Sequence, residues 1–512
     1  MYLDSVSNSA IKLINITKTF GTVKANNQIC IELRRGEILA LLGENGSGKT
    51  TLMNMLSGIY FPDSGEIFVD GKEVIIRSPK DAYNLGIGMI HQHFKLVDVL
   101  TASENIILGL KGKAQINRSE LAEEILGISE KYGFSIDPNK KIYDMSVSEK
   151  QKVEIVKVLY RGANTLILDE PTAVLTPQET DKLFDMLRKM RDDGKAVIII
   201  THKLNEVLAI SDRVVILRKG QCVGETDTKD ATVQSLTEGM VGRAIDLEIQ
   251  REEPDFGETR LLVDGLTCIN ADGIKALDNV SFDLRAGEIL GVAGIAGSGQ
   301  KELCESLTGL YPIEGGSVIY NENDKQDDIT GLSPTDIVKK GVRIAFVPED
   351  RLGMGLVAAL DMVDNMMLKS YNEKKGFFVD RKTPKEAAEK LIDALEIVTP
   401  GASTPVRRLS GGNVQKVLLG REIESDPSVL VVAYPVRGLD INSSYTVYNL
   451  LNAQRKAGVA VLYVGEDLDV LLELCDRIMV LCGGRMSGIV EAPNATKEQL
   501  GLMMTQIGQV AG

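Results

Sequence analysis

The chain has 512 residues, of which 44% are hydrophobic and 25% are charged, and its formal net charge is −14. A single hydrophobic core stops growing at about 250–300 residues, so this length predicts two or more domains. The acidic balance gives no global attraction to nucleic acid, and no apolar run approaches the ~18 residues of a membrane span.

The cysteines and the N-terminal residues indicate a cellular compartment. The six cysteines form no C-x-x-C pair, which argues against a zinc ribbon or a redox pair. The first residues carry neither a basic region nor an apolar one, so no signal peptide is expected. We therefore expect reduced thiols in the cytoplasm.

The first half opens with a pattern typical of strands and then a glycine-rich loop. Alternating apolar residues at 11–14 and 29–33 predict a small antiparallel sheet. An apolar run at 38–42 predicts a buried strand, and residues 52–56 are compatible with a helix. Between them, residues 43–51 read Gly-Glu-Asn-Gly-Ser-Gly-Lys-Thr-Thr and match G-x-x-x-x-G-K-[ST].

This strand–loop–helix setting predicts a loop that binds the phosphates of a nucleotide. Gly43, Gly46 and Gly48 let the backbone turn successive N–H groups inward, and the following helix adds its positive end. The ammonium of Lys49 can reach the β- and γ-phosphates, and the hydroxyl of Thr50 can ligate Mg²⁺. The nucleotide-binding residues expected from this segment are Gly43, Glu44, Asn45, Gly46, Ser47, Gly48, Lys49, Thr50 and Thr51.

Apolar strands and helical patterns then alternate. Strands are predicted at 65–71, at 86–92 ending in Gln92, at 165–170 ending in Asp169 and Glu170, and at 196–202 ending in His202. Residues 118–134 and 149–161 have helical spacing. The alternation predicts an α/β fold with a mostly parallel sheet and helices on both faces.

The second half repeats this plan. Residues 35–39 return as 286–290, and Gly43 corresponds to Gly294. Three later pairs share an offset of 264: Ser146 with Ser410, Asp169 with Ala433 and His202 with Glu466. The constant offset predicts a duplicated domain. A charged stretch with a proline predicts a linker at 242–257, between domains at 1–241 and 258–512.

These motifs together resemble the ATP-binding-cassette ATPases, and the resemblance covers nearly the whole chain. Residues 409–413, Leu-Ser-Gly-Gly-Asn, resemble the family's signature loop. A final Asn and two fused cassettes resemble the importer subfamily for simple sugars and nucleosides. The resemblance implies two tandem P-loop nucleotide-binding domains, each with a mostly parallel core sheet, an antiparallel β subdomain and a helical subdomain.

The resemblance also implies roles for the first-half residues. Thr50 and Gln92 would hold Mg²⁺, with Asp169 behind it through water. Glu170 would polarise the attacking water as general base, and His202 would contact the γ-phosphate. Phe20 would stack on adenine. The signature residues Ser410, Gly411 and Gly412 would contact the nucleotide.

Each assignment has a plainer alternative. Asp169 and Glu170 could cap the segment that follows them, and His202 could be an ordinary surface histidine. Phe20 could simply pack beside a β-hairpin. The pair Gly411 and Gly412 could form a plain turn.

The second half departs from the family pattern. Its loop has Gln300 at the lysine position and Lys301 at the hydroxyl position. Gln92, Asp169, Glu170 and His202 are matched by Glu349, Ala433, Tyr434 and Glu466. Glu349 and Glu466 would repel a triphosphate, and the second copy lacks the general base.

The first half, in turn, has an eroded signature. It reads Met-Ser-Val-Ser-Glu at 145–149, with Ser148 at the second glycine position. In the family, each ATP lies between one copy's phosphate loop and the other copy's signature. The intact first loop would then face the intact Ser410 signature, which predicts one hydrolytic site per chain.

We therefore expect the ATPase subunit of an importer on the cytoplasmic face of the membrane, using ATP and Mg²⁺. By resemblance it would dock on two transmembrane permease subunits and serve an extracellular substrate-binding lipoprotein, with no nucleic acid partner. Residues 92–105 resemble the nucleoside importers, and ribose- or galactose-like sugars are the runner-up. Within that segment, Phe94, Leu96 and Val97 form either a packed loop or a permease-docking groove.

A soluble twin-cassette ATPase that acts in translation is a less favoured alternative. That class usually has two complete sites, a long basic linker and basic tails. Here the linker is short, the second site is degraded and the charge is acidic. A DNA-repair cassette protein would need cysteine-pair zinc modules.

Overall fold

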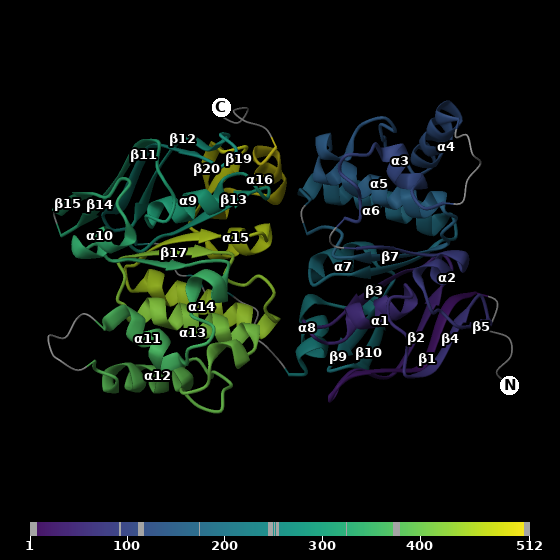
Figure 1. Ribbon diagram of the computed structural model, residues 1–512, viewed down its shortest axis with the longest axis horizontal. Coiled ribbons are helices and arrows are strands. Elements are labelled where there is room, and N and C mark those ends of the chain that lie inside the picture. The colour runs from purple at the N-terminus through teal and green to yellow at the C-terminus, as the bar shows by residue number, and fades with distance from the viewer. Residues whose placement is uncertain are drawn as a thin grey trace. The chain divides into compact units, whose positions relative to one another are not determined.

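The computed structural model describes residues 8–91, 94–110, 117–173, 175–243, 249, 251, 255–323, 325–371 and 379–505. The chain divides into two compact units, Met1–Asp246 and Leu247–Gly512. This division falls inside the 242–257 segment. Each unit contains its own four-stranded and six-stranded sheets (Figure 1).

The first unit begins with an antiparallel sheet in the order β2-β1-β4-β5. Its described strands are β1 (Ser9–Phe20), β2 (Val23–Arg34), β4 (Ser64–Val69) and β5 (Lys72–Val74). Every neighbouring pair in it is antiparallel. The structure therefore confirms the small antiparallel sheet that the alternating apolar residues before residue 37 predict.

The main sheet of the first unit has the order β10-β9-β3-β8-β7-β6. Its described strands are β3 (Ile38–Leu42), β6 (Ile87–Ile90), β7 (Thr165–Asp169), β8 (Ala196–Ile200), β9 (Arg213–Arg218) and β10 (Gln221–Asp227). All neighbours are parallel except β10, which pairs antiparallel with β9. The carboxyl ends of β3, β8 and β7 therefore lie along one edge, where α/β folds bind ligands.

Helices cover both faces of this sheet (Figure 1). The described α-helices are α1 (Lys49–Leu56), α2 (Pro79–Asn84), α3 (Ala102–Ile107), α4 (Arg118–Lys131), α5 (Val147–Tyr160), α6 (Pro177–Asp192), α7 (Leu204–Ile210) and α8 (Val233–Val241). Leu39 and Leu41 share a buried cluster with α1 and the antiparallel sheet, whereas Ile38 joins α5 and α6. Successive side chains of β3 thus stabilise opposite faces. A separate core joins α3, α4 and α5 as a helical subdomain.

The second unit has the same topology, which confirms the predicted repeat. Its antiparallel sheet has the order β12-β11-β14-β15 and its main sheet the order β16-β17-β18-β13-β19-β20. The first sheet contains β11 (Thr259–Ile269), β12 (Lys275–Arg285), β14 (Gly315–Glu322) and β15 (Lys325–Asp328). The second contains β13 (Ile289–Gly294), β16 (Ile344–Val347), β17 (Val429–Ala433), β18 (Ala460–Val464), β19 (Arg477–Cys482) and β20 (Arg485–Glu491).

The helices of the second unit also follow the first. The described α-helices are α9 (Gln300–Leu307), α10 (Pro334–Lys339), α11 (Met362–Ser370), α12 (Lys382–Ala394), α13 (Gly411–Glu424), α14 (Ile441–Lys456), α15 (Leu468–Leu474) and α16 (Lys497–Met503). A single π-helical turn, η3 (Arg351–Gly355), follows β16. Within the described residues, no helix is long and apolar enough to cross a membrane.

Candidate functional site

The phosphate-loop residues form a tight turn between β3 and α1. Gly43 has φ 152° and Gly48 has φ 101°, which are conformations that favour glycine. A Cβ on Gly43 would lie 2.2 Å from the carbonyl oxygen of Leu217, and one on Gly48 would lie 2.3 Å from that of Ala25. The loop therefore makes a tight turn that leaves no room for a side chain at either position.

Lys49 is buried at the start of α1, with only 9% of its surface exposed. Its Nζ donates to the carbonyl oxygens of Gly43 at 2.5 Å and Glu44 at 3.0 Å. Burial lowers the pKa of Lys49, and the nearby carboxylates of Glu170 and Asp169 oppose that shift. A buried ammonium that donates to carbonyl groups is well placed to exchange them for phosphate oxygens.

Other members of the loop are more exposed or lack partners. Asn45, Gly46 and Thr50 are exposed, and Thr51 is half-buried. The Oγ of Ser47 is buried and has no hydrogen-bond partner among the described residues. Such an orphaned hydroxyl inside a cradle of glycines fits a ligand that brings its own acceptors.

Asp169 and Glu170 stand at the carboxyl end of β7. Glu170 has φ 48° and its N–H donates to the carbonyl oxygen of Ile200 at 2.8 Å. Its Oε1 lies 2.9 Å from Nδ1 of His202, while its buried Oε2 has no partner among the described residues. Burial and the charge of Glu170 raise the pKa of Asp169 to about 6, against the opposing effect of Lys49.

This geometry bears on the alternatives left open by the sequence. The next helix, α6, is capped by Thr176 with Glu179, so the two carboxylates do not cap it. His202 is exposed, with 66% of its side chain accessible, but its ring contacts Glu170. Phe20 is 44% exposed and packs edge-on against Tyr60, with ring centroids 5.3 Å apart, on the surface.

The donor set of this site fits a nucleotide with Mg²⁺. The described residues hold no cluster of three or more His, Cys, Asp or Glu side chains that could cage a metal. Mg²⁺ usually takes one or two carboxylates, waters and phosphate oxygens instead. Asp169 and Glu170 supply two carboxylates that interact electrostatically with the Lys49 ammonium, and Oε2 of Glu170 has no partner among the described residues, so the site fits such a ligand. Gln92 lies outside the described residues.

The second unit keeps the backbone of this site and lacks its charges. The Nε2 of Gln300 donates to the carbonyl oxygen of Ile295 at 3.1 Å, as Lys49 does to Glu44. Tyr434 has φ 47° and its N–H donates to the carbonyl oxygen of Val464 at 2.9 Å, as Glu170 does to Ile200. The second unit therefore keeps the backbone conformation of the first site, but Gln300 and Tyr434 stand where the first unit has Lys49 and Glu170.

Sequence reasoning missed Arg437 in the second unit. Its guanidinium makes an ion pair with Glu349, and its Nε lies 3.4 Å from Oε1 of Glu466. The two acids therefore share one cation. The sequence alone predicts Glu349 and Glu466 to be unpaired groups that would repel a triphosphate. The offset of 264 puts Arg437 opposite Ala173, so a full comparison of the repeats could have found it.

The signature residues Ser410, Gly411 and Gly412 lie at the start of α13 in the second unit. Ser410 is the N-cap, and its Oγ accepts hydrogen bonds from the backbone and side chain of Asn413 at 3.4 and 2.8 Å. A Cβ on Gly412 would lie 2.6 Å from Oγ of Ser443. These contacts form a structured helix start, not a plain turn, and a shared site with Lys49 stays a prediction.

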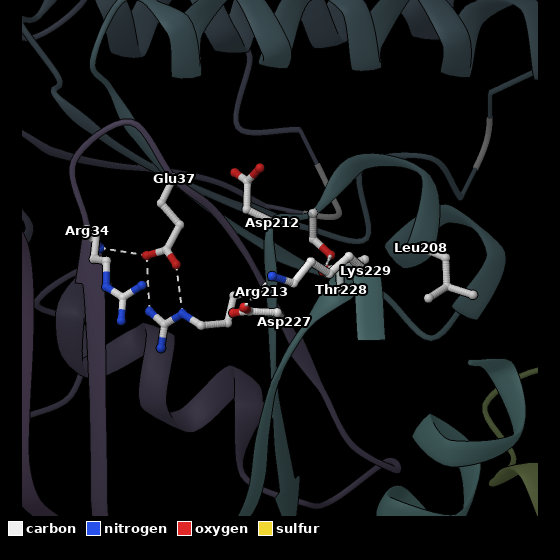
Figure 2. A pocket seen from close by; sticks show the side chains of 9 residues that line it. Arg34, Glu37, Leu208, Asp212, Arg213, Asp227, Thr228 and Lys229 are labelled. Atoms are coloured by element: carbon white, nitrogen blue, oxygen red, sulfur yellow. Dashed lines mark hydrogen bonds and ion pairs between the residues drawn. The ribbon is translucent and has the colours of Figure 1, made fainter. Parts of the chain in front are cut away.

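A pocket of about 470 Å³ in the first unit lies away from the phosphate loop (Figure 2). It surrounds a buried ion pair in which Arg213 donates to Glu37 at 2.7 and 3.0 Å. Glu37 precedes β3, whereas the phosphate loop follows that strand, so the two features occupy opposite ends. The second unit repeats the pair as Arg477 with Glu288, which indicates a structural role.

The sequence of this chain is similar to those of known proteins. The family model described as ABC transporter matches residues 26–173 and 277–435. The nucleoside import ATP-binding protein NupA of Lactococcus lactis is 41% identical over 502 residues, 97% of this chain and 98% of that protein. The guanosine import ATP-binding protein NupO of Bacillus subtilis is 42% identical over 500 residues, 96% of this chain and 97% of that protein. The ribose import ATP-binding protein RbsA 1 of Streptomyces avermitilis is 38% identical over 500 residues, 97% of this chain and 93% of that protein.

Proposed function

This chain belongs to the ABC transporter family, and we propose that it is the ATP-hydrolysing subunit of an importer for nucleosides. It is an ATP-binding enzyme that hydrolyses ATP, as the family does. The observation that carries the substrate class is its full-length similarity, at 41% and 42% identity, to the nucleoside and guanosine import proteins. The 38% identity to the ribose import protein supports simple sugars as the second candidate.

The first unit would carry the chemistry. Lys49 and the loop amides would bind the phosphates, where fixed positive charge stabilises the transition state. Thr50 and Gln92 would hold Mg²⁺, with Asp169 behind it through water, and the metal would offset the charge of the phosphates.

Glu170 would act as general base on the attacking water. Its contact with His202 fixes one carboxylate oxygen and leaves the other, Oε2, without a partner among the described residues. His202 would hold Glu170 and contact the γ-phosphate. Phe20, on the surface beside Tyr60, would stack on the adenine ring.

The signature of the second unit would complete this site. Ser410, Gly411 and Gly412 would donate to the γ-phosphate held by the first loop. The loss of charge at Gln300, Ala433 and Tyr434 supports a single hydrolytic site. The first-unit signature, with Ser148 for glycine, would face the degraded loop.

The proposed setting is the cytoplasmic face of the cell membrane. Two transmembrane permease subunits would bind the chain, and an extracellular substrate-binding lipoprotein would deliver the nucleoside. Binding of ATP would close the two units, and hydrolysis would reopen them.

Uptake measurements test the substrate class. Cells that lack this chain should lose uptake of labelled nucleosides and keep that of labelled ribose and galactose. The wild-type chain should restore nucleoside uptake and Lys49→Ala should not, although both are made at equal levels. Loss of sugar uptake with nucleoside uptake intact would favour the second candidate and contradict the first.

A further inference from the structure

The guanidinium of Arg437 joins three loops at one edge of the second main sheet. Glu349 follows β16, Arg437 follows β17 and Glu466 follows β18, and these three strands are parallel neighbours. Arg437 donates from Nη1 to Glu349, and its Nε lies 3.4 Å from Glu466. We call Glu349, Arg437 and Glu466 the acid–arginine clamp.

The first unit differs at the sequence position of the clamp's cation. The position of Arg437 is taken there by Ala173, a methyl side chain. In a hydrolysing site, a nucleotide with its metal would tie the same loops together. The second unit has lost both the ammonium of Lys49 and the carboxylate of Asp169, and it has gained a fixed guanidinium at the neighbouring loop.

A second arginine extends the clamp toward the signature loop. Arg351, in the π-helical turn η3, donates from Nη2 to the carbonyl oxygen of Arg437. Its Nη1 would lie 3.5 Å from a Cβ placed on Gly411. Gly411 is the first residue of α13, which Ser410 caps. Contacts therefore run from Glu466 and Glu349 through Arg437 to Arg351, and the guanidinium of Arg351 lies beside the first residue of the signature helix.

The physical character of these contacts favours a positioning role over a stabilising one. The side chains of Arg437, Glu349 and Glu466 are each about half exposed, and such pairs contribute little to stability. One planar guanidinium shared by two carboxylates nevertheless fixes the geometry of both. Arg351 is desolvated, which lowers its pKa, and its buried Nε has no partner among the described residues.

We propose that Arg437 and Arg351 are positioning residues that hold Ser410–Asn413 in the arrangement needed for hydrolysis at the first loop. The second unit would thereby keep its signature loop in place without a nucleotide and metal in its own loop. The inference rests on the proposed function, because it requires the Ser410 signature to serve the site of Lys49.

Steady-state ATPase of the full chain with its permease subunits tests the role of the clamp. Arg437→Ala and Arg351→Ala should each lower kcat about tenfold and change KM for ATP less than about twofold, since the signature contact strengthens in the transition state. Arg351→Lys should retain most of the activity, because an ammonium can still donate to the carbonyl of Arg437. Arg437→Lys should stay impaired, because a point charge does not bridge two carboxylates in a fixed plane.

Arg343 offers a matched control. It also pairs with two carboxylates, Glu322 and Asp426, but it precedes β16 at the other end of that strand. Arg343→Ala should leave kcat and KM unchanged. Thermal unfolding of the Arg437 and Arg343 variants should be similar, so that a difference in kcat does not reflect global stability.

Two combined variants distinguish positioning from charge neutralisation. Arg351→Ala added to Arg437→Ala should reduce kcat little further, because the two residues form one chain of contacts. Arg437→Ala with Glu349→Gln and Glu466→Gln should remain impaired. Full recovery in that triple variant would mean that the arginine only neutralises the acids, and would overturn the proposal.

Ser410→Arg separates this proposal from the function on which it rests. If Ser410→Arg removes ATPase activity while Arg437→Ala behaves like Arg343→Ala, the clamp is overturned and the shared site stands. If Ser410→Arg is harmless, the shared site itself is wrong and the clamp proposal falls with it.

Discussion

Asp169 and Glu170 are adjacent carboxylates, and the ammonium of Lys49 interacts electrostatically with both. Burial and Glu170 together raise the pKa of Asp169 from 3.8 to about 6. The folded chain therefore holds this proton more tightly than the unfolded chain does. The resulting stabilisation is present below about pH 4 and is lost as the pH rises through 6. At neutral pH, the ionised Asp169 therefore lowers the stability of the folded chain when no ligand is bound.

Asp169→Asn should therefore stabilise the nucleotide-free chain while removing its ATPase activity. Two pKa units correspond to ~3 kcal/mol, and partial exposure reduces the expected gain to about 1–2 kcal/mol. The gain, measured by thermal or urea unfolding, should be largest above pH 6.5 and should shrink toward pH 4. An equal effect at both pH values would contradict the shifted pKa.

Lys49 and Gln300 occupy equivalent positions with different charge. Lys49→Ala should remove measurable ATP turnover, because loss of a charge contact in the transition state costs ~3 kcal/mol or more, about a hundredfold in rate. Gln300→Ala is the matched control and should leave turnover near that of the wild type. Near-normal hydrolysis by Lys49→Ala would contradict the assignment of residues 43–51 as a phosphate-binding loop.

At the scale of elements, the phosphate loop depends on its close approach to β9 and to the β-sheet residue Ala25. The carbonyl of Leu217 in β9 leaves no space beside Gly43, and that of Ala25 leaves none beside Gly48. The backbone conformation at this position matters for the proposed site, because its N–H groups, rather than side chains, are expected to bind the phosphates.

Gly48→Ala should abolish nucleotide binding by forcing the loop away from Ala25. Binding of a fluorescent ATP analogue measures this directly. Gly162→Ala is the matched control, since Gly162 has φ 82° but no atom within 4 Å of a new Cβ. It should bind nucleotide normally and lose only about 1 kcal/mol of stability through backbone strain. If both variants lose binding equally, backbone strain explains the loss, and the close approach of Gly48 to Ala25 is not its cause.

The sequence predicted the strands well because parallel strands buried on both faces are continuous apolar runs. Residues 38–42 and 196–200 are such runs, and they became β3 and β8. Helix ends were less exact. The predicted helix at 118–134 ends at Lys131, since Gly133 adopts φ 79° just beyond it.

Site contacts between distant residues were harder to predict. The loop glycines and Lys49 lie in one short motif, so their local geometry follows from the sequence. Arg437 pairs with Glu349, 88 positions away in the chain. No local pattern links these two residues, so the acids alone suggested repulsion. The pairing depends on the order of β16 and β17, which only the folded sheet provides.

At the scale of the whole molecule, the two units share a topology and differ in their chemistry. The backbone of Tyr434 reproduces that of Glu170, with φ 47° and 48°. The charges of the first loop are absent from the second, whereas the glycine signature at Gly412 is replaced by Ser148 in the first unit. These losses are complementary if each nucleotide lies between one loop and the other unit's signature.

ATPase activity of Ser410→Arg and Ser146→Arg, with the permease subunits present, tests this one-site account most directly. An arginine at either helix start adds bulk and charge where the signature meets the nucleotide. Ser410→Arg should remove turnover as fully as Lys49→Ala, whereas Ser146→Arg should retain most of it. If Ser146→Arg proves as damaging as Ser410→Arg, the second loop contributes to hydrolysis and the account is wrong.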